Sequence, residues 1–219
     1  MDTAPHPAGN PGTHLAITPS ILYFGTPVVL LTTENADGTF NLAPISSAWA
    51  LGQVVVLGLG RQGQTGANLA VRPELVISLP DPGHWAAVEH LGELTGRPAA
   101  AGHGPRRARY EPDKFAAAGF RTQPSHTVRP PRVAECPIQL EARAARVGTD
   151  AAGDFLIVEA RMLKVHADPR LVVAGTQHIE PAAWSPLIYN FRHYFGLGPE
   201  LRHSGVSETP RRSAVASVR

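Results

Sequence analysis

Three strand-like runs follow one another in residues 26–68, and they constrain the fold more than any other part of the chain. Val28–Thr33 is a run of β-branched and aliphatic residues, which is typical of a buried strand. The next turn, Asn-Ala-Asp-Gly at 35–38, tolerates positive φ angles, so we expect a hairpin into Phe40–Trp49. A valine-rich strand over Val54–Leu59 comes next. This order indicates antiparallel pairing from the start of the chain.

The second of these runs is not built like an ordinary strand. It carries the polar residues Asn41, Ser46 and Ser47 among small ones, with Pro44 in its middle. Proline has no backbone N–H, so it removes a donor from the sheet and indicates an edge, a bulge or a break. The backbone N–H groups left free by such an interruption could bind a polar, planar ligand.

Later segments add a second hairpin, a further strand over Leu75–Leu79 and several short helices. Residues 136–146 and 154–166 form two long strand-like segments, joined by a glycine-bounded turn at 148–153. Because strands outnumber helices and two hairpins are present, we expect a mainly β fold with α insertions, a closed or nearly closed antiparallel barrel, rather than a parallel sheet. The expected helices cover Gln64–Val71, His84–Thr95 and 111–118.

The clearest helical pattern lies in His84–Thr95. Trp85, Val88, Leu91 and Leu94 recur at spacings of three, which predicts one buried stripe. This helix and the one that follows place helical insertions at about residues 84–119.

The chain has 219 residues, enough for one domain with a sizeable core, which we assign to residues 20–203. Residues 1–19 and 204–219 lack hydrophobic periodicity and are expected to be flexible tails. The apolar runs are too short to span a membrane, no secretory signal is recognised, and the one cysteine excludes an internal disulfide, so we expect a cytoplasmic protein. A net charge of +2, with arginines scattered among alanine, glycine and proline, indicates neither a nucleic-acid nor a membrane partner.

Gly58–Gly63 is a literal Gly-x-Gly-x-x-Gly motif between a strand and a helix, and Asp81 follows at about the distance of a ribose-binding acid. These features are typical of a dinucleotide-binding Rossmann domain. The helix, however, has only about two turns before Pro73, and no alternation of strands and helices follows. The other interpretation is a glycine-rich strand end leading to a helix N-terminus that could hold a phosphate.

Five motifs occur in a recognisable order: Thr26–Leu31, residues 37–38 with Asn41–Trp49, Gln64–Leu69, Tyr110–Phe115 and Pro131–Glu141. Together they resemble the flavin reductase-like family with an FMN-binding split barrel, the family of flavoredoxin. The likeness covers Ser20–Gly198.

The resemblance implies a six-stranded antiparallel Greek-key barrel that forms a homodimer and binds FMN without a covalent link near the subunit interface. It also implies hydride or electron transfer between NAD(P)H and flavin, with no catalytic residue singled out. By position, one segment should lie along the isoalloxazine and ribityl chain: Asn41, Ala43, Pro44, Ser46, Ser47 and Trp49. The phosphate should lie at Thr65 and Asn68, with Arg61 and Gln64 nearby.

Three further residues have two interpretations each. Lys114 is either an exposed helical lysine or a contact to the phosphate of FMN or of the nicotinamide. His193 and Tyr194, in an aromatic segment, could cap the flavin or pack across the dimer. The ten histidines form no HxH or HExxH pattern, so no metal is expected, and Cys136 is expected to be a buried core thiol.

The chemistry of these residue types agrees with a flavin site. A hydroxyl, an amide and an arginine at a helix start can bind a doubly charged phosphate. Hydride transfer needs two rings held in position more than it needs acid–base groups, so a missing triad does not exclude an enzyme.

Several functions remain open at this point. The leading interpretation is an oxidoreductase of flavin reductase type, with a flavin-dependent monooxygenase or another redox protein as partner. The alternatives are an FMN-holding electron-transfer protein, a biosynthetic tailoring flavoenzyme and a Rossmann dehydrogenase. In the tailoring enzyme, the Pro98–Arg109 insertion and the aromatic C-terminal segment could enclose an organic substrate. The sequence does not distinguish NADH from NADPH.

Overall fold

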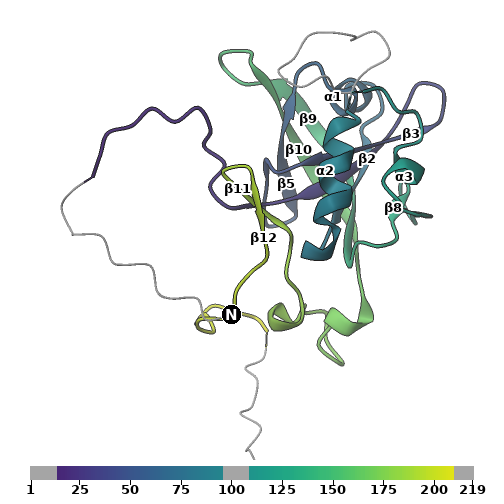
Figure 1. The fold of residues 1–219 in the computed structure, drawn as a ribbon. Coiled ribbons are helices and arrows are strands. Elements are labelled where there is room, and N and C mark those ends of the chain that lie inside the picture. Colours follow the sequence, from purple (N-terminus) through teal and green to yellow (C-terminus); the bar gives the residue numbers. More distant parts are fainter. Residues whose placement is uncertain (1–13, 96–108, 210–219) are drawn as a thin grey trace, which may run out of the picture.

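A seven-stranded antiparallel sheet forms the body of the protein in the computed structural model, which describes residues 14–95 and 109–209 (Figure 1). Its strand order is β3-β2-β6-β9-β10-β5-β4. Each neighbouring pair in this sheet is antiparallel. The strands are β2 (Val29–Glu34), β3 (Phe40–Ile45), β4 (Ala48–Leu51), β5 (Val54–Gly60), β6 (Glu74–Leu79), β9 (Ile138–Thr149) and β10 (Phe155–Ala167).

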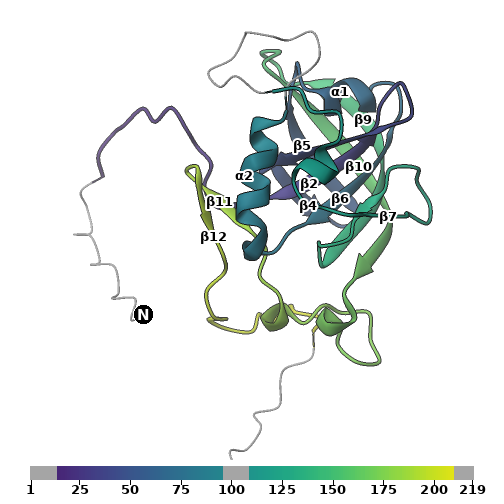
Figure 2. The same cartoon turned by 45° about the vertical axis from the view of Figure 1, so that its right-hand side comes forward.

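The two edge strands of this sheet, β3 and β4, are consecutive in the chain. Only Ser46 and Ser47 separate them, and the N–H of Gly58 in β5 donates to the carbonyl of Ser47 at 2.8 Å. Counted as one interrupted strand, β3 and β4 bring the two edges of the sheet together, so six strands wrap around a common interior (Figure 2). The predicted split barrel is confirmed.

The interruption lies two residues beyond Pro44. The sequence predicted a single strand over Phe40–Trp49, but the chain leaves the sheet at Ser46–Ser47. Before this interruption β3 pairs with β2, and after it β4 pairs with β5. Pro44 itself pairs with Leu30 in an edge strand, where a missing N–H costs no central hydrogen bond. The prediction of an edge or break at this proline is confirmed.

Three α-helices lie among the described residues, α1 (Gln64–Leu69), α2 (Trp85–Glu93) and α3 (Lys114–Ala117). α2, preceded by the 3₁₀ turn η1 (Pro82–His84), crosses one face of the sheet (Figure 1). The prediction that Trp85 belongs to its buried stripe is wrong, because Trp85 is 54% exposed whereas Val88, Leu91 and Leu94 are buried. Trp85 is the first residue of α2. Within the described ranges, no helix is both long and apolar enough to cross a membrane.

Two hydrophobic clusters lie on opposite faces of β2. Val29 and Leu31 point into the barrel, whereas Val28 and Leu30 point to a layer that contains α2 and α3. Successive side chains of a strand alternate between faces, so a continuous apolar run is what a strand buried on both faces requires. The second cluster also holds Cys136, whose thiol pKa is raised by burial, as expected for a core residue.

Smaller elements complete the described chain. β1 (Thr26–Pro27), β11 (Ile188–Asn190) and β12 (His193–Phe195) form a three-stranded sheet beside α2, and β7 (Thr122–Gln123) pairs with β8 (Arg132–Val133). Two further 3₁₀ turns are η2 (Pro169–Leu171) and η3 (Pro181–Ala183). The expected tails and the Pro98–Arg109 insertion lie largely outside the described residues, and the predictions about them stay predictions.

The Rossmann interpretation of Gly58–Gly63 is wrong. β5 pairs antiparallel with both neighbours, so no parallel crossover surrounds the motif. Its first glycine serves packing instead, because a Cβ on Gly58 would meet the Cβ of Ser47 at 3.0 Å. Asp81 caps η1 by accepting from the N–H of Gly83 at 2.9 Å.

Candidate flavin site

The largest cavity of the site, about 500 Å³, opens where β3 gives way to β4. We call it the large cavity. One wall is the interrupted strand with the end of β5, and the other is α2 with the β11–β12 hairpin. Its lining residues are Tyr23, Val28, Pro44, Ile45, Ser46, Ser47, Gly58, Gly60, Val88, Glu89, Gly92, Tyr189, Arg192 and Tyr194.

Two smaller cavities continue from it. A narrow cavity of about 150 Å³ shares Pro44, Ile45 and Gly60 with the large one. An outer cavity of about 210 Å³ shares three lining residues with the narrow one, namely Asn41, Gln64 and Lys114. The three cavities therefore form a row that starts in an aromatic-lined space and ends at a lysine.

Lys114 is the charged group at the end of this row. It is only 4% exposed, although it opens the short helix α3, and its Nζ donates to Oδ1 of Asn41 at 2.6 Å. Burial lowers the pKa of Lys114 to about 8, and the nearby Glu111 opposes that shift. The interpretation of Lys114 as an exposed helical lysine is wrong. A buried cation without a carboxylate hydrogen-bond partner among the described residues is suited to an anionic ligand.

Asn41 links Lys114 to the start of α1. Its Nδ2 donates to Oγ1 of Thr65 at 3.1 Å, so Lys114, Asn41 and Thr65 form one buried polar chain. Thr65 and Gln64 both line the narrow cavity. Elements far apart in sequence, β3, α1 and α3, thus present an amine, an amide and a hydroxyl to the same small space.

Asn68 does not belong to this polar chain, and its side chain makes hydrogen bonds that hold α1 in place. Its Nδ2 donates to Oγ1 of Thr33 at 3.1 Å and to Oδ1 of Asn35 at 2.9 Å, and its Oδ1 accepts from Gln64 at 2.8 Å. These bonds tie α1 to β2 and to the following turn.

Replacing Asn68 with alanine is therefore expected to lower the free energy of unfolding by about 2–3 kcal/mol, because buried Thr33 and half-buried Asn35 and Gln64 lose their hydrogen bonds. The control Thr65→Ala, which removes one such bond, should cost about 1 kcal/mol. Urea unfolding of both variants measures the difference. Equal, small losses would show that Asn68 does not hold α1 in place.

The predicted site residues divide into two groups. The first group lines the row of cavities: Asn41, Ala43, Pro44, Ser46, Ser47, Gln64, Thr65, Lys114 and Tyr194. The second group does not line it. Arg61 donates to the carbonyl of Gly153 in the β9–β10 turn, Trp49 is 59% exposed on β4, and His193 is exposed on β12. The structure does not bring these three side chains to the cavities, and Asn68, the remaining predicted residue, does not line them either because it is bonded to Thr33 and Asn35.

Most residues of the other wall of the large cavity were not predicted from the sequence. Tyr23, Tyr189, Glu89 and Arg192 line it, and the hydroxyl of Tyr194 donates to Glu89 Oε2 at 2.9 Å. The aromatic segment at residues 188–197 was the available signal for part of this wall. Its pairing with Tyr23 and α2 depends on long-range contacts that no local pattern reveals.

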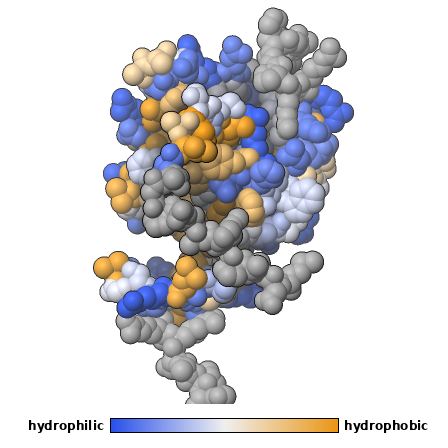
Figure 3. Space-filling view, turned by 60° about the vertical axis from the view of Figure 1, so that its left-hand side comes forward, coloured by the Kyte–Doolittle hydropathy of each residue, from blue (hydrophilic) through white to orange (hydrophobic). Residues whose placement is uncertain are grey.

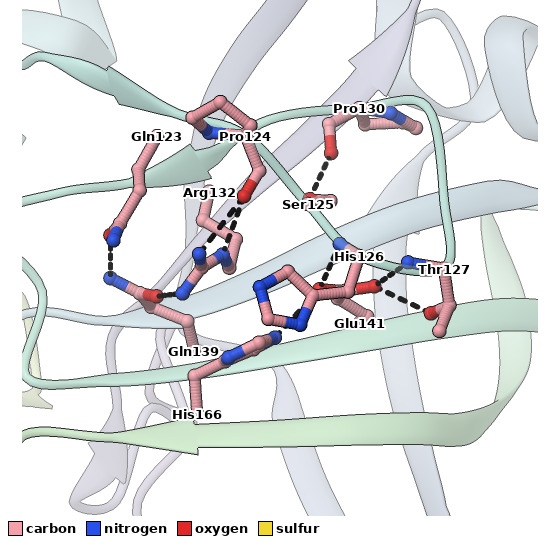
Figure 4. A network of polar contacts seen from close by, with 10 residues as sticks. All are labelled: Gln123, Pro124, Ser125, His126, Thr127, Pro130, Arg132, Gln139, Glu141 and His166. Atoms are coloured by element: carbon pink, nitrogen blue, oxygen red, sulfur yellow. Dashed lines mark hydrogen bonds and ion pairs between the residues drawn. The ribbon is translucent and has the colours of Figure 1, made fainter.

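A second polar cluster lies on β9 and β10, outside the cavity linings (Figure 4). The carboxylate of Glu141 is fully buried and accepts hydrogen bonds from the N–H of His126 at 2.8 Å, the N–H of Thr127 at 2.6 Å and Nε2 of His166 at 2.6 Å. Arg132 and Gln139 lie beside it and bond to each other at 2.8 Å. Within 14–95 and 109–209, no three histidine, cysteine or acidic side chains form a group that could hold a metal ion.

Comparison with known proteins identifies the family. A family model described as the flavin reductase like domain matches residues 21–198. The chain belongs to this family. It is a flavin reductase-like protein, and the resemblance seen in the sequence is confirmed.

Two kinds of relative support this assignment. An uncharacterized protein, YdfE of Bacillus subtilis (strain 168), is 43% identical to this flavin reductase-like protein over 198 residues, covering 88% of this chain and 94% of YdfE. Flavoredoxin of Desulfovibrio vulgaris (Miyazaki F) has a TM-score of 0.74 at 18% identity, with 90% of this chain and 100% of that chain covered. Nitrilotriacetate monooxygenase component B from Bacillus cereus has a TM-score of 0.69 at 19% identity, with 88% and 100% covered. The two solved structures share the fold of this chain.

Proposed function

We propose that this protein is an FMN-binding oxidoreductase of flavin reductase type, which passes hydride from NADH or NADPH to the flavin. The row of cavities that ends at buried Lys114 is the observation that carries this proposal. The family assignment supports flavin as the cofactor class.

The residues of the row fit FMN. The large cavity, about 500 Å³, has the size of an ordinary cofactor pocket and combines apolar with polar lining. Lys114 is a single buried cation in the narrow cavity, which matches the single terminal phosphate of FMN. We therefore propose that the ring lies against Pro44–Ser47 and the phosphate at Lys114.

The chain's own residues would bind and orient rather than transfer protons. Flavin supplies the two-electron chemistry when it is bound. Ser46 and Ser47, where the sheet is interrupted, offer hydroxyl and backbone donors to the polar edge of a planar ring. Tyr189 and Tyr194 also line this space and would shield a bound ring from water.

Equilibrium titration with FMN and FAD, followed by flavin fluorescence, tests the cofactor. We expect FMN to bind at least about tenfold more tightly than FAD, because one buried lysine neutralises one terminal phosphate. Equal affinities, or a preference for FAD, would overturn the choice of FMN and leave the family's flavin chemistry standing.

We also propose that two copies pair through the outer face of the barrel. Apolar side chains gather on the side that Figure 3 brings forward, and exposed large hydrophobic residues include Trp49 and Leu51 on β4 and Ile157, Leu163 and Val165 on β10. Exposed apolar surface of this kind is typical of an interaction site. A redox partner such as a monooxygenase, and a cytoplasmic location, remain parts of the proposal that follow from the predicted class.

Trp49→Glu together with Leu51→Lys should convert this proposed dimer to a monomer, because charges would be buried in the interface. Light scattering after gel filtration gives the mass. A wild-type protein that is monomeric at micromolar concentration would contradict the pairing.

A further inference from the structure

The turn between β11 and β12 is built from residues that such a turn does not favour. Phe191 and Arg192 have φ angles of +46° and +65°, and they are the two non-glycine residues with positive φ in the described ranges. Two-residue hairpin turns with positive φ at both positions normally use Asn-Gly or Asp-Gly. A non-glycine residue in this conformation is strained, and strain of this kind gathers at functional sites.

Neighbouring contacts hold the strained turn in place. The N–H of Phe191 donates to the carbonyl of Tyr23 at 2.5 Å. The ring centroids of Tyr23 and Tyr189 lie 5.8 Å apart, and those of Tyr189 and Tyr194 lie 5.0 Å apart. The three tyrosine rings therefore lie next to one another, tilted, and all three residues line the large cavity.

The consequence of this geometry is the position of Arg192. Arg192 lines the large cavity together with Pro44–Ser47 of the interrupted strand. Within the described residues, the Arg192 guanidinium has neither a hydrogen-bond acceptor nor an acidic partner, while Glu89 in the same wall is bonded to the Tyr194 hydroxyl. Arg192 is an exposed residue that lines the same cavity as the three tyrosines. A guanidinium in such a place, without a carboxylate, is suited to bidentate binding of an oxyanion.

We propose that Arg192 binds the anionic group, a phosphate or a carboxylate, of the second substrate that meets the flavin in the large cavity. The substrate class is a planar ring carrying such a group. The tyrosine rings can pack against the planar ring, and the Arg192 guanidinium can donate two hydrogen bonds to the oxyanion. This inference rests on the proposed function, since it assumes that the flavin ring occupies the opposite wall.

The test compares a charged with a neutral hydride donor. Arg192→Gln removes the charge, Arg192→Lys keeps it, and Arg202→Gln removes a charge from a residue outside the cavity lining. For Arg192→Gln we expect the KM for NADH to rise at least about tenfold with kcat and the flavin Kd within about twofold, and Arg192→Lys to recover part of the loss. N-benzyl-1,4-dihydronicotinamide, which carries no phosphate, should be oxidised equally by Arg192→Gln and wild type.

Calorimetric titration with benzoate distinguishes the two kinds of oxyanion. A KM effect with NADH and unchanged benzoate binding assigns Arg192 to a phosphate, and the reverse pattern assigns it to a carboxylate. Unchanged values for both probes, or an equal loss with the neutral donor, would overturn the proposal. A wild-type protein that oxidises neither donor would refute the proposed function, whereas benzoate binding would still report on Arg192.

Arg192→Gly checks the strain separately, since glycine adopts positive φ without penalty. We expect its melting temperature to rise by about 2–4 °C, while NADH binding weakens as in Arg192→Gln. An Arg192→Gly variant that is less stable than wild type would show that the positive φ of Arg192 does not cost stability.

Discussion

Replacing Lys114 with methionine is expected to weaken FMN binding at least about 100-fold, because it removes the one cation that lies buried in the narrow cavity. The same change should raise the melting temperature of the flavin-free protein. In that state the ammonium group is buried, and among the described residues its one hydrogen-bond acceptor is Asn41. Methionine fills similar space without the cost of desolvation. A gain in stability with a loss of binding separates this role from damage to the fold.

The pKa of Lys114 also predicts the direction in which FMN affinity changes with pH. Burial lowers the pKa of Lys114 to about 8 from 10.5, so above pH 8 the flavin-free site holds a neutral amine. A bound phosphate favours the charged form, and binding above pH 8 therefore takes up a proton. We expect the FMN affinity of the wild type to fall by up to about tenfold per pH unit above pH 8. The affinity of the Lys114→Met variant should fall less steeply over the same range.

Lys164 provides the matched control, since it is the other lysine of the chain and lies exposed on β10. Lys164→Met should leave FMN affinity and its pH profile unchanged. Fluorescence titrations between pH 6.5 and 9.5 cover the range. Wild-type affinity in Lys114→Met would show that the phosphate lies elsewhere.

Replacing Glu141 with glutamine is expected to cost about 3–5 kcal/mol of unfolding free energy, a large part of the 5–15 kcal/mol typical of a domain. The carboxylate is fully buried and accepts from His126, Thr127 and His166. A glutamine amide would turn an N–H₂ group toward at least one of these donors. The loss of acceptors would release the loop at residues 125–131 from β9 (Figure 4).

Glu141 and His166 make the fold sensitive to acid. Burial alone would raise the pKa of Glu141, but its hydrogen bonds from Thr127, His126 and His166 outweigh burial and lower it to about 2 from 4.5. This carboxylate therefore contributes stability that is complete above pH 4.5 and is lost as the pH falls toward 2. Burial lowers the pKa of His166 below 6.5 against the opposing bond to Glu141, so stability also declines as the pH falls below 6.5.

Urea unfolding at pH 7, 5 and 3 tests this second prediction. Glu159→Gln is the control, because Glu159 is an exposed partner of Arg146 on the same sheet and should cost less than about 1 kcal/mol. A Glu141→Gln variant with the stability and acid sensitivity of wild type would contradict the role given to the buried carboxylate.

Local patterns were enough to predict most of the barrel. The turn at residues 35–38 and the run at Val54–Leu59 lie where the structure has a hairpin and β5, because strand and turn chemistry is decided by near neighbours. The single strand over Phe40–Trp49 was not resolved into β3 and β4, since the two pieces pair with strands far away in sequence. The Gly58–Gly63 motif misled for the same reason, because its meaning depends on the direction of the neighbouring strands.

The candidate site was predictable on one side only. Asn41 and Thr65 belong to a recognisable motif, and the structure joins them by a hydrogen bond. Nothing in the sequence around Lys114 reveals burial at 4% exposure, which follows from the packing of α3 beside β3. Arg192 was unpredictable because a strained φ is a property of the folded turn.

One measurement tests the central claim most directly: an anaerobic absorption spectrum of the protein with one equivalent of FMN, recorded before and after addition of NADH or NADPH. The expected result is a shift of the flavin band on mixing, followed by bleaching with at least one nicotinamide at a rate far above that of free FMN. A flavin band unshifted by the protein, and no faster bleaching, would contradict the assignment of the cavities to a flavin and its hydride donor.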